Sequence, residues 1–261
     1  MSDSIATYTF LPWLRQGIAN NITATDGDPS VALRADINVS LKVSGNGLNG
    51  STLEETISQD VQLYGPGDIV GIDSTAIIKN EPLNYITNFE PNYLPYVDFY
   101  DEDLPWRYTP AAPDTVKDRL RPWIALVVLK EDEFTNGTNV LNRPLNYIDV
   151  TDPYGSFPPS DQLWAWAHVH INQGMMDDIV ASSGDKATVI SNFESLLADD
   201  PYMAYARLIC PRKLAANTAY HAFIVPVFES GRLAGLSCIT PRSAGRRAVL
   251  RRFALDRSCA H

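Results

Sequence analysis

The chain has 261 residues, a formal net charge of -10 at neutral pH, 45% hydrophobic residues and 20% charged residues. A chain of this length and composition can bury a core without disulfides or metals, which excludes disorder over most of it. Its acidic balance repels nucleic-acid phosphates and anionic lipid surfaces, so we expect no nucleic-acid partner.

The N-terminal residues have no basic start followed by an apolar run, and no stretch approaches the roughly 18 apolar residues of a membrane span. We therefore expect that the protein does not insert into a membrane and that it assembles in the cytoplasm. Three cysteines, Cys210, Cys238 and Cys259, stand at irregular spacing without a CxxC pair, which predicts free thiols rather than a disulfide framework.

Residues 1–22 are predicted to form an extended arm, because a proline and a glycine interrupt an apolar and aromatic stretch between Thr7 and Ile22. Such an arm packs on its own domain or on a neighbouring subunit, and the sequence leaves both open. Its candidate interface residues are Phe10, Trp13 and Leu14.

The stretch from Leu33 to Val43 alternates strictly between apolar and polar residues, which is typical of a strand with one buried and one wet face. A turn-rich loop, Ser44–Gly50, separates it from a second alternating stretch, Thr52–Tyr64. The pattern predicts an antiparallel hairpin. The glycine-rich residues 64–68 predict a further turn, and residues 68–73 a short strand.

Further strands are predicted along the rest of the chain, and residues 136–159 are predicted to be rich in loops. The strands are 96–100, 123–130 (buried on both faces), 163–171, 205–209 and 220–228. The best helix candidate is 186–198, which carries one apolar stripe. Because strands follow one another without alternating helices, we expect a mainly β (α+β) fold: a single antiparallel β-sandwich-like domain over residues 23–241, with long loops and one or two short helices.

The segment WAWAHVHI would place Trp164, Trp166, His168 and His170 on one strand face. Two histidines two residues apart can share a metal, but nothing in the sequence aims a third ligand at them. A packing face with hydrogen-bonded imidazoles is the favoured interpretation, so no metal and no cofactor is expected.

An acidic cluster, Asp98, Asp101, Glu102 and Asp103, does not have the spacing of a calcium loop. A carboxylate pair for glycoside hydrolysis depends on a separation in space that the sequence does not give. The favoured interpretation is a loop that is solvated or paired with arginines, for which Arg107, Arg119 and Arg121 are the nearby candidates. The chain has no GxSxG, HExxH or P-loop motif, and we expect it not to be an enzyme.

The block from Phe89 to Pro113 is dense in aromatic residues, acids and prolines. Prolines fix the backbone, and rigid aromatic side chains lose little entropy on binding. The block is predicted to be either a subunit contact or a cover over its own core. Its candidate interface residues are Tyr93, Tyr96, Tyr100, Trp106, Arg107 and Tyr108.

Several long stretches resemble proteins encoded with extracellular contractile injection systems, which are phage-tail-like particles. The stretches are FEPNYLPYVDFYDEDLPWRYTPA (89–111), RLRPWIALVVLKEDEF (119–134), TYTFLPWLRQGI (7–18), LYGPGDIVGID (63–73) and YHAFIVPVFESGRLAGL (220–236). The resemblance implies a structural component at a tube or sheath end, as a cap, cap adaptor or baseplate-associated protein. Its partners would be tube, sheath or cap subunits, in a homo-oligomeric ring that is usually six-fold, within a particle released extracellularly.

After Leu236, residues 237–261 depart from these proteins, and the last 20 of them, 242–261, form an Arg-rich tail. This tail holds six arginines against the single acid Asp256, whereas residues 1–241 hold 15 basic and 30 acidic residues. We interpret this Arg-rich tail as a substituted, non-native end, with a nucleic-acid-binding tail as the alternative. For the whole chain, a lumen plug or cargo protein and a carbohydrate-binding module or glycosidase are the alternative functions.

Overall fold

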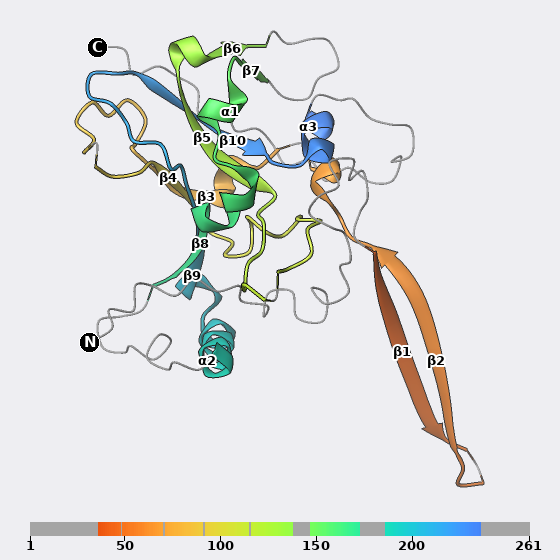
Figure 1. Ribbon diagram of the computed structural model, residues 1–261. Helices are drawn as coiled ribbons and strands as arrows, with labels where there is room; N and C mark the ends of the chain where they lie inside the picture. The colour runs from red at the N-terminus through yellow and green to blue at the C-terminus, as the bar shows by residue number, and fades with distance from the viewer. Residues whose placement is uncertain are drawn as a thin grey trace.

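The computed structural model describes residues 36–47, 49–69, 71–90, 92–114, 116–137, 147–172 and 186–235 (Figure 1). The strands are β1 (Asp36–Asn46), β2 (Thr52–Gln62), β3 (Ile77–Glu81), β4 (Tyr96–Phe99), β5 (Ile124–Lys130), β6 (Phe134–Asn136), β7 (Ile148–Val150), β8 (Ala167–Ile171), β9 (Ala204–Ile209) and β10 (Tyr220–Pro226). The α-helices are α1 (Pro153–Ser156), α2 (Lys186–Asp199) and α3 (Glu229–Gly235). The short 3-10 helices are η3 (Pro66–Asp68), η4 (Ser74–Ala76), η5 (Glu131–Glu133), η6 (Ser160–Trp166) and η7 (Pro201–Met203).

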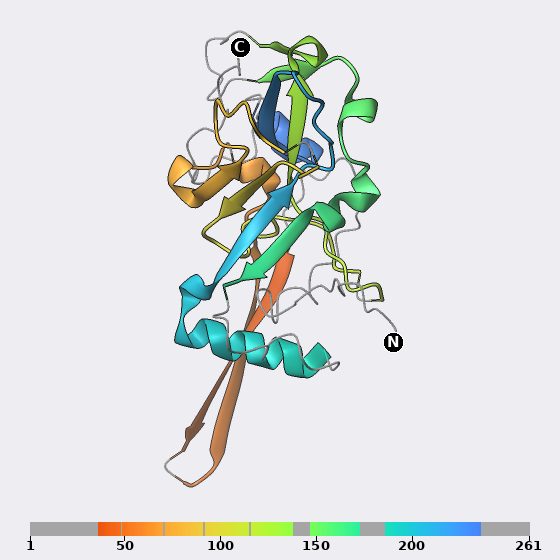
Figure 2. The same cartoon turned by 90° about the vertical axis from the view of Figure 1, so that its left-hand side faces the viewer.

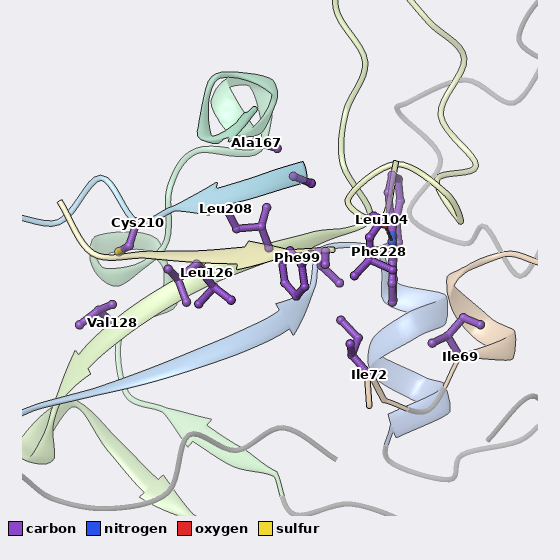
Figure 3. Close-up of a cluster of buried hydrophobic side chains, with 14 of the residues drawn as sticks. Ile69, Ile72, Phe99, Leu104, Leu126, Val128, Ala167, Leu208, Cys210 and Phe228 are labelled. Atoms are coloured by element: carbon purple, nitrogen blue, oxygen red, sulfur yellow. Dashed lines mark hydrogen bonds between the residues drawn. The ribbon is translucent and has the colours of Figure 1, made fainter. Parts of the chain in front are cut away.

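The core lies between a four-stranded antiparallel sheet, in the order β3-β4-β9-β8, and the antiparallel pair β10-β5. Phe99 of β4 and Leu208 of β9 point from the larger sheet toward Leu126 and Val128 of β5 (Figure 3). Val97 of β4 belongs to the same buried cluster. Alternation along each strand sends every second side chain into this layer. The expected mainly β, sandwich-like fold is confirmed.

Strand β5 is buried on both faces, as its unbroken apolar run predicts. One face contributes to the core between the sheets, and the other packs Val127 and Leu129 against Phe134 and Phe223. A second, smaller contact is made by helix α2, whose buried Phe193 packs near Ala204 of β9. The predicted helix over 186–198 is confirmed.

Two predicted strands are wrong, one wholly and one in part. The turn predicted over residues 64–68 forms as η3, which Pro66 starts and in which the Asp68 carboxylate accepts a hydrogen bond from the Gly65 amide at 3.0 Å. The short strand predicted over 68–73 does not form, because Asp68 belongs to η3 and residues 71–73 belong to no strand. In the strand predicted over 163–171, the first residues, including Trp164 and Trp166, belong instead to η6. This 3-10 helix begins directly after the Pro158–Pro159 pair. Only the portion from Ala167 to Ile171 is extended.

In the part of the chain that the structure describes, no helix combines the length and apolar character needed to cross a membrane. The buried residue Cys210 is a free thiol, as predicted, and burial raises its pKa. The other two cysteines lie outside the described residues, as do the N-terminal arm and the Arg-rich tail.

Candidate assembly surface

The β1–β2 hairpin projects away from the two-sheet body in both views (Figures 1 and 2). Its register pairs eleven residues of each strand, from Asp36 opposite Gln62 to Asn46 opposite Thr52. At about 3.3 Å per residue, each strand is about 36 Å long. Every side chain described in the hairpin strands is exposed. The predicted hairpin is confirmed, but the expectation that one face is buried within the described residues is wrong.

One face of the hairpin is apolar and uncovered by the described residues. Leu41 stands opposite Ile57, and Leu53 stands opposite Gly45. Six large apolar side chains on this face have exposed fractions between 40% and 65%. They are Val39, Leu41, Val43, Leu53, Ile57 and Val61. An exposed apolar strip of this length is typical of a surface that binds another protein segment.

The opposite face of the hairpin is polar, and its side chains bond to one another across the strands. The Asn38 amide donates to the Asp60 carboxylate at 2.8 Å, and the hydroxyls of Ser40 and Ser58 lie 2.7 Å apart. The ammonium of Lys42 lies 2.8 Å from the Glu54 carboxylate. These contacts hold the strands in register and leave the apolar face as the one that lacks partners among the described residues.

The base of the hairpin is anchored by α3. Gly231 of α3 lies so close to η3 that a Cβ built on it would stand 3.2 Å from Cβ of Pro66 and 2.8 Å from Cβ of Pro226. Close approach of these backbones therefore requires a glycine at this position. Beside them, Ile69 and Phe228 belong to the central core (Figure 3). The β1–β2 hairpin thus extends from a packed base.

The Phe89–Pro113 block divides into exposed and packed parts. Tyr93 and Tyr100 are 66% and 55% exposed. Trp106 is half-buried against the core and donates a hydrogen bond from Nε1 to the Leu120 carbonyl at 3.1 Å. The half-buried Tyr108 makes an edge-to-face contact with Trp123, with ring centroids 5.2 Å apart. The later part of the block therefore covers its own core, and the two exposed tyrosines stay free for contact.

Tyr96 and Asp98 of β4 contribute to the outer face of the larger sheet. The register places Lys79, Asp98, Arg207 and His168 side by side across the four strands. The Arg207 guanidinium donates from Nε and Nη2 to the two Asp98 carboxylate oxygens at 2.7 and 2.9 Å and stacks on the Tyr96 ring at 3.8 Å. Asp98 is only 1% exposed, and its carboxylate raises the pKa of Arg207. This pair is a structural ion pair of the sheet.

A hollow of ≈ 530 Å³ lies beside this pair. Its lining is mainly aromatic and apolar, with Arg207 and Glu81 as the charged members. The other lining residues are Phe89, Asn92, Tyr93, Leu94, Tyr96 and Ile209. The hollow adds an aromatic contact area around the exposed Tyr93.

The two histidines considered as metal ligands lie on this outer face. A ring nitrogen of His168 lies 2.8 Å from the Ala165 carbonyl, and the ring of His170 stacks on Tyr205 at 5.3 Å between centroids. Burial lowers the pKa of both imidazoles. Within the described ranges, no group of three or more histidine, cysteine or acidic side chains is placed to hold a metal ion.

The acidic cluster is only partly paired in the way expected. Arg107 bonds to Asp101 and Asp103, as one of the proposed partners. Asp98 instead pairs with Arg207, and burial raises the pKa of Glu102. The other two candidates serve elsewhere: Arg119 stacks on Trp164 at 3.8 Å, and Arg121 donates to the Val227 carbonyl at 3.3 Å.

Two further arginine contacts were not predicted from the sequence. Arg207 and Arg212 bind Asp98 and Glu133 across separations of 109 and 79 residues. Nothing in the local pattern marks either pair. The antiparallel register of β4 and β9 brings Arg207 to Asp98, whereas Arg212 follows β9 and meets Glu133 of η5. The clearest signal in the sequence was the alternation of 33–43 and 52–64, which located the hairpin.

Comparison with known proteins gave no match for this chain among protein-family models, curated proteins or solved structures. The features that indicate a function are therefore the apolar face of the hairpin, the aromatic hollow and the resemblance carried by the sequence stretches.

Proposed function

We propose that the protein is a structural component of a contractile injection particle, at a tube or sheath end, as a cap, cap adaptor or baseplate-associated protein. The observation that carries this proposal is the projecting hairpin with its uncovered apolar face. The side chains of the polar face bond to one another within the hairpin, so the apolar face is the one whose burial by a partner would be favourable.

Burial of this face contributes favourable free energy to assembly. Fully burying a large aliphatic side chain is worth about 1.5–3 kcal/mol, and the six side chains are each about half exposed. Covering them therefore contributes at most about 5–8 kcal/mol before the entropy cost of association. A contact of this strength is modest alone but becomes firm when each copy in a ring makes it.

The test replaces a register pair on the apolar face. The double variant Leu41→Ser, Ile57→Ser is expected to lower incorporation into purified particles at least about tenfold. The matched control is Ser40→Ala, Ser58→Ala, the neighbouring register pair on the polar face, which should leave incorporation unchanged. Circular dichroism and thermal melting of each isolated protein verify that the body is folded.

Normal incorporation of the apolar-face variant would refute the hairpin as the assembly surface. Counting copies per particle by quantitative mass spectrometry distinguishes a ring component from a plug or cargo protein. A ring component is present in a fixed multiple set by the particle symmetry, whereas cargo is present at low, variable number and leaves on contraction.

A further inference from the structure

The apolar face of the β1–β2 hairpin carries two polar side chains, and they are placed symmetrically. Along the strands, from base to tip, the central register pairs of this face are Val39 with Gln59, Leu41 with Ile57, and Val43 with Glu55. Gln59 and Glu55 are both exposed, and they are the polar members of this face among the side chains that the structure describes. They lie two residues to either side of Ile57 on β2, so the Leu41–Ile57 pair marks the centre between them.

This symmetry fits a two-fold contact between two copies of the chain. If two hairpins lie face to face and antiparallel, with their Leu41–Ile57 pairs in contact, β2 of one copy lies over β2 of the other. Glu55 then stands opposite Gln59 of the second copy, and the same contact is made twice in the dimer. A glutamine amide donates to a carboxylate, so each polar group gains a partner where the apolar side chains around it are buried.

Other ways of joining the same two hairpins are less favourable. In a parallel face-to-face pair, β2 lies over β1 of the second copy, which places Glu55 opposite Val43. A buried carboxylate without a partner is costly. Edge-to-edge pairing of the strands would extend the sheet, but it would leave the apolar side chains in water. The antiparallel face-to-face arrangement is therefore the one that both buries the apolar face and pairs its polar groups.

The size of this contact predicts a reversible dimer. The strip is about 36 Å long and two strands, or about 10 Å, wide, so two copies together bury roughly 700 Å². Stable complexes bury at least about 1,200 Å², and smaller contacts are typical of transient association. We therefore expect the free protein to pass from monomer to dimer as its concentration rises.

We infer that, in the free protein, the apolar face of the β1–β2 hairpin is covered by the same face of a second copy. The two hairpins lie antiparallel, and Glu55 of each copy bonds to Gln59 of the other. Such a cover stabilises the hairpin, because an isolated two-stranded hairpin is at best marginally stable in water. Entry into a particle through this face then requires the pair to separate, a consequence that rests on the proposed function.

The test measures the dissociation constant of the dimer by sedimentation equilibrium of the isolated full-length protein, at low ionic strength and from about 1 μM to about 1 mM. Gln59→Glu should weaken the dimer at least about tenfold, because Glu55 then meets a like charge at two places. Gln59→Lys should tighten it at least about threefold, because the same two places become ion pairs. The exchanged variant Glu55→Gln, Gln59→Glu keeps the pairing and should restore the dissociation constant of the unmodified chain.

The matched controls are Ser58→Glu and Ser58→Lys, which make the same changes of charge on the polar face. They should shift the dissociation constant by less than about twofold. Circular dichroism of each variant verifies that it is folded. A monomer over the whole concentration range would overturn the proposal, as would failure of the exchanged variant to dimerise. Equal weakening by Gln59→Glu and Gln59→Lys, which the parallel arrangement predicts, would overturn it too.

The two proposals fail separately. Sedimentation is measured on isolated protein, so its result does not depend on any particle. If the charge variants behave as expected while Leu41→Ser, Ile57→Ser still enters particles normally, the dimer exists but the strip is not the assembly surface. If the free protein is a monomer while that variant is excluded from particles, the assembly surface stands and the dimer is refuted.

Discussion

The two residues of the Asp98–Arg207 pair are expected to differ in how much stability their replacement costs. Asp98 is buried at the centre of the larger sheet, whereas the Arg207 side chain is 18% exposed at its surface. Replacing Arg207 by Met leaves a buried carboxylate without its bidentate partner, which costs about 3–5 kcal/mol. Replacing Asp98 by Asn leaves a guanidinium that can turn toward water and keeps one acceptor oxygen, so the cost falls to about 1–2 kcal/mol.

The free energy of unfolding is measured by urea denaturation, followed by tryptophan fluorescence, for the unmodified chain, both single variants and the double variant. The double variant should lose less than the sum of the two single losses, because the carboxylate that makes Arg207→Met costly has gone. Equal losses in the two single variants, or losses below about 1 kcal/mol in both, would refute the reasoning.

Three further results are expected. Trp106→Ala removes a half-buried indole and its hydrogen bond and should cost about 2–4 kcal/mol in urea denaturation, whereas the exposed Tyr93→Ala should change stability by less than about 0.5 kcal/mol. Arg212 lowers the pKa of Glu133 to about 2. The ion pair therefore stabilises the folded state fully above the ordinary pKa of 4.5, by about 1–2 kcal/mol after screening by solvent, and this stabilisation is lost as pH falls through about 2. The free energy of unfolding of an Arg212→Met variant, measured over a pH series, should lack this step. Deleting residues 1–22 should prevent incorporation into particles, and co-purification of the truncated chain with intact particles would contradict the assembly role of the arm.

Where one principle governs a segment, the sequence was sufficient to locate it. The uninterrupted apolar run of β5 predicted burial on both faces, and the apolar stripe of 186–198 predicted α2. Errors arose where turn chemistry competed with alternation. The Pro158–Pro159 pair precedes a 3-10 segment that replaces the start of a predicted strand, and the strand predicted over 68–73 fails because η3 extends to Asp68 and residues 71–73 belong to no strand.

Side-chain function in the Phe89–Pro113 block could not be resolved from composition. Tyr93 and Trp106 are both aromatic residues among prolines, yet one lines an open hollow and the other bonds to a backbone carbonyl 14 residues away. The distinction depends on how the chain after β4 folds back over Trp123. The Asp98–Arg207 pair is equally hidden, because β4 and β9 are neighbours only through a register set by long-range pairing.

The hairpin shows what alternation can and cannot specify. A strict period of two demands that one face be covered, but it does not say whether the cover comes from the same domain, a terminal segment or another subunit. A two-stranded hairpin in water is at best marginally stable, and the polar-face contacts here are exposed and individually weak. An apolar strip about 36 Å long therefore needs a cover for the hairpin to hold its own shape. An assembly partner that covers the strip would therefore also stabilise the hairpin itself. The exposed Tyr93 and its aromatic hollow are a second described surface suited to such a contact.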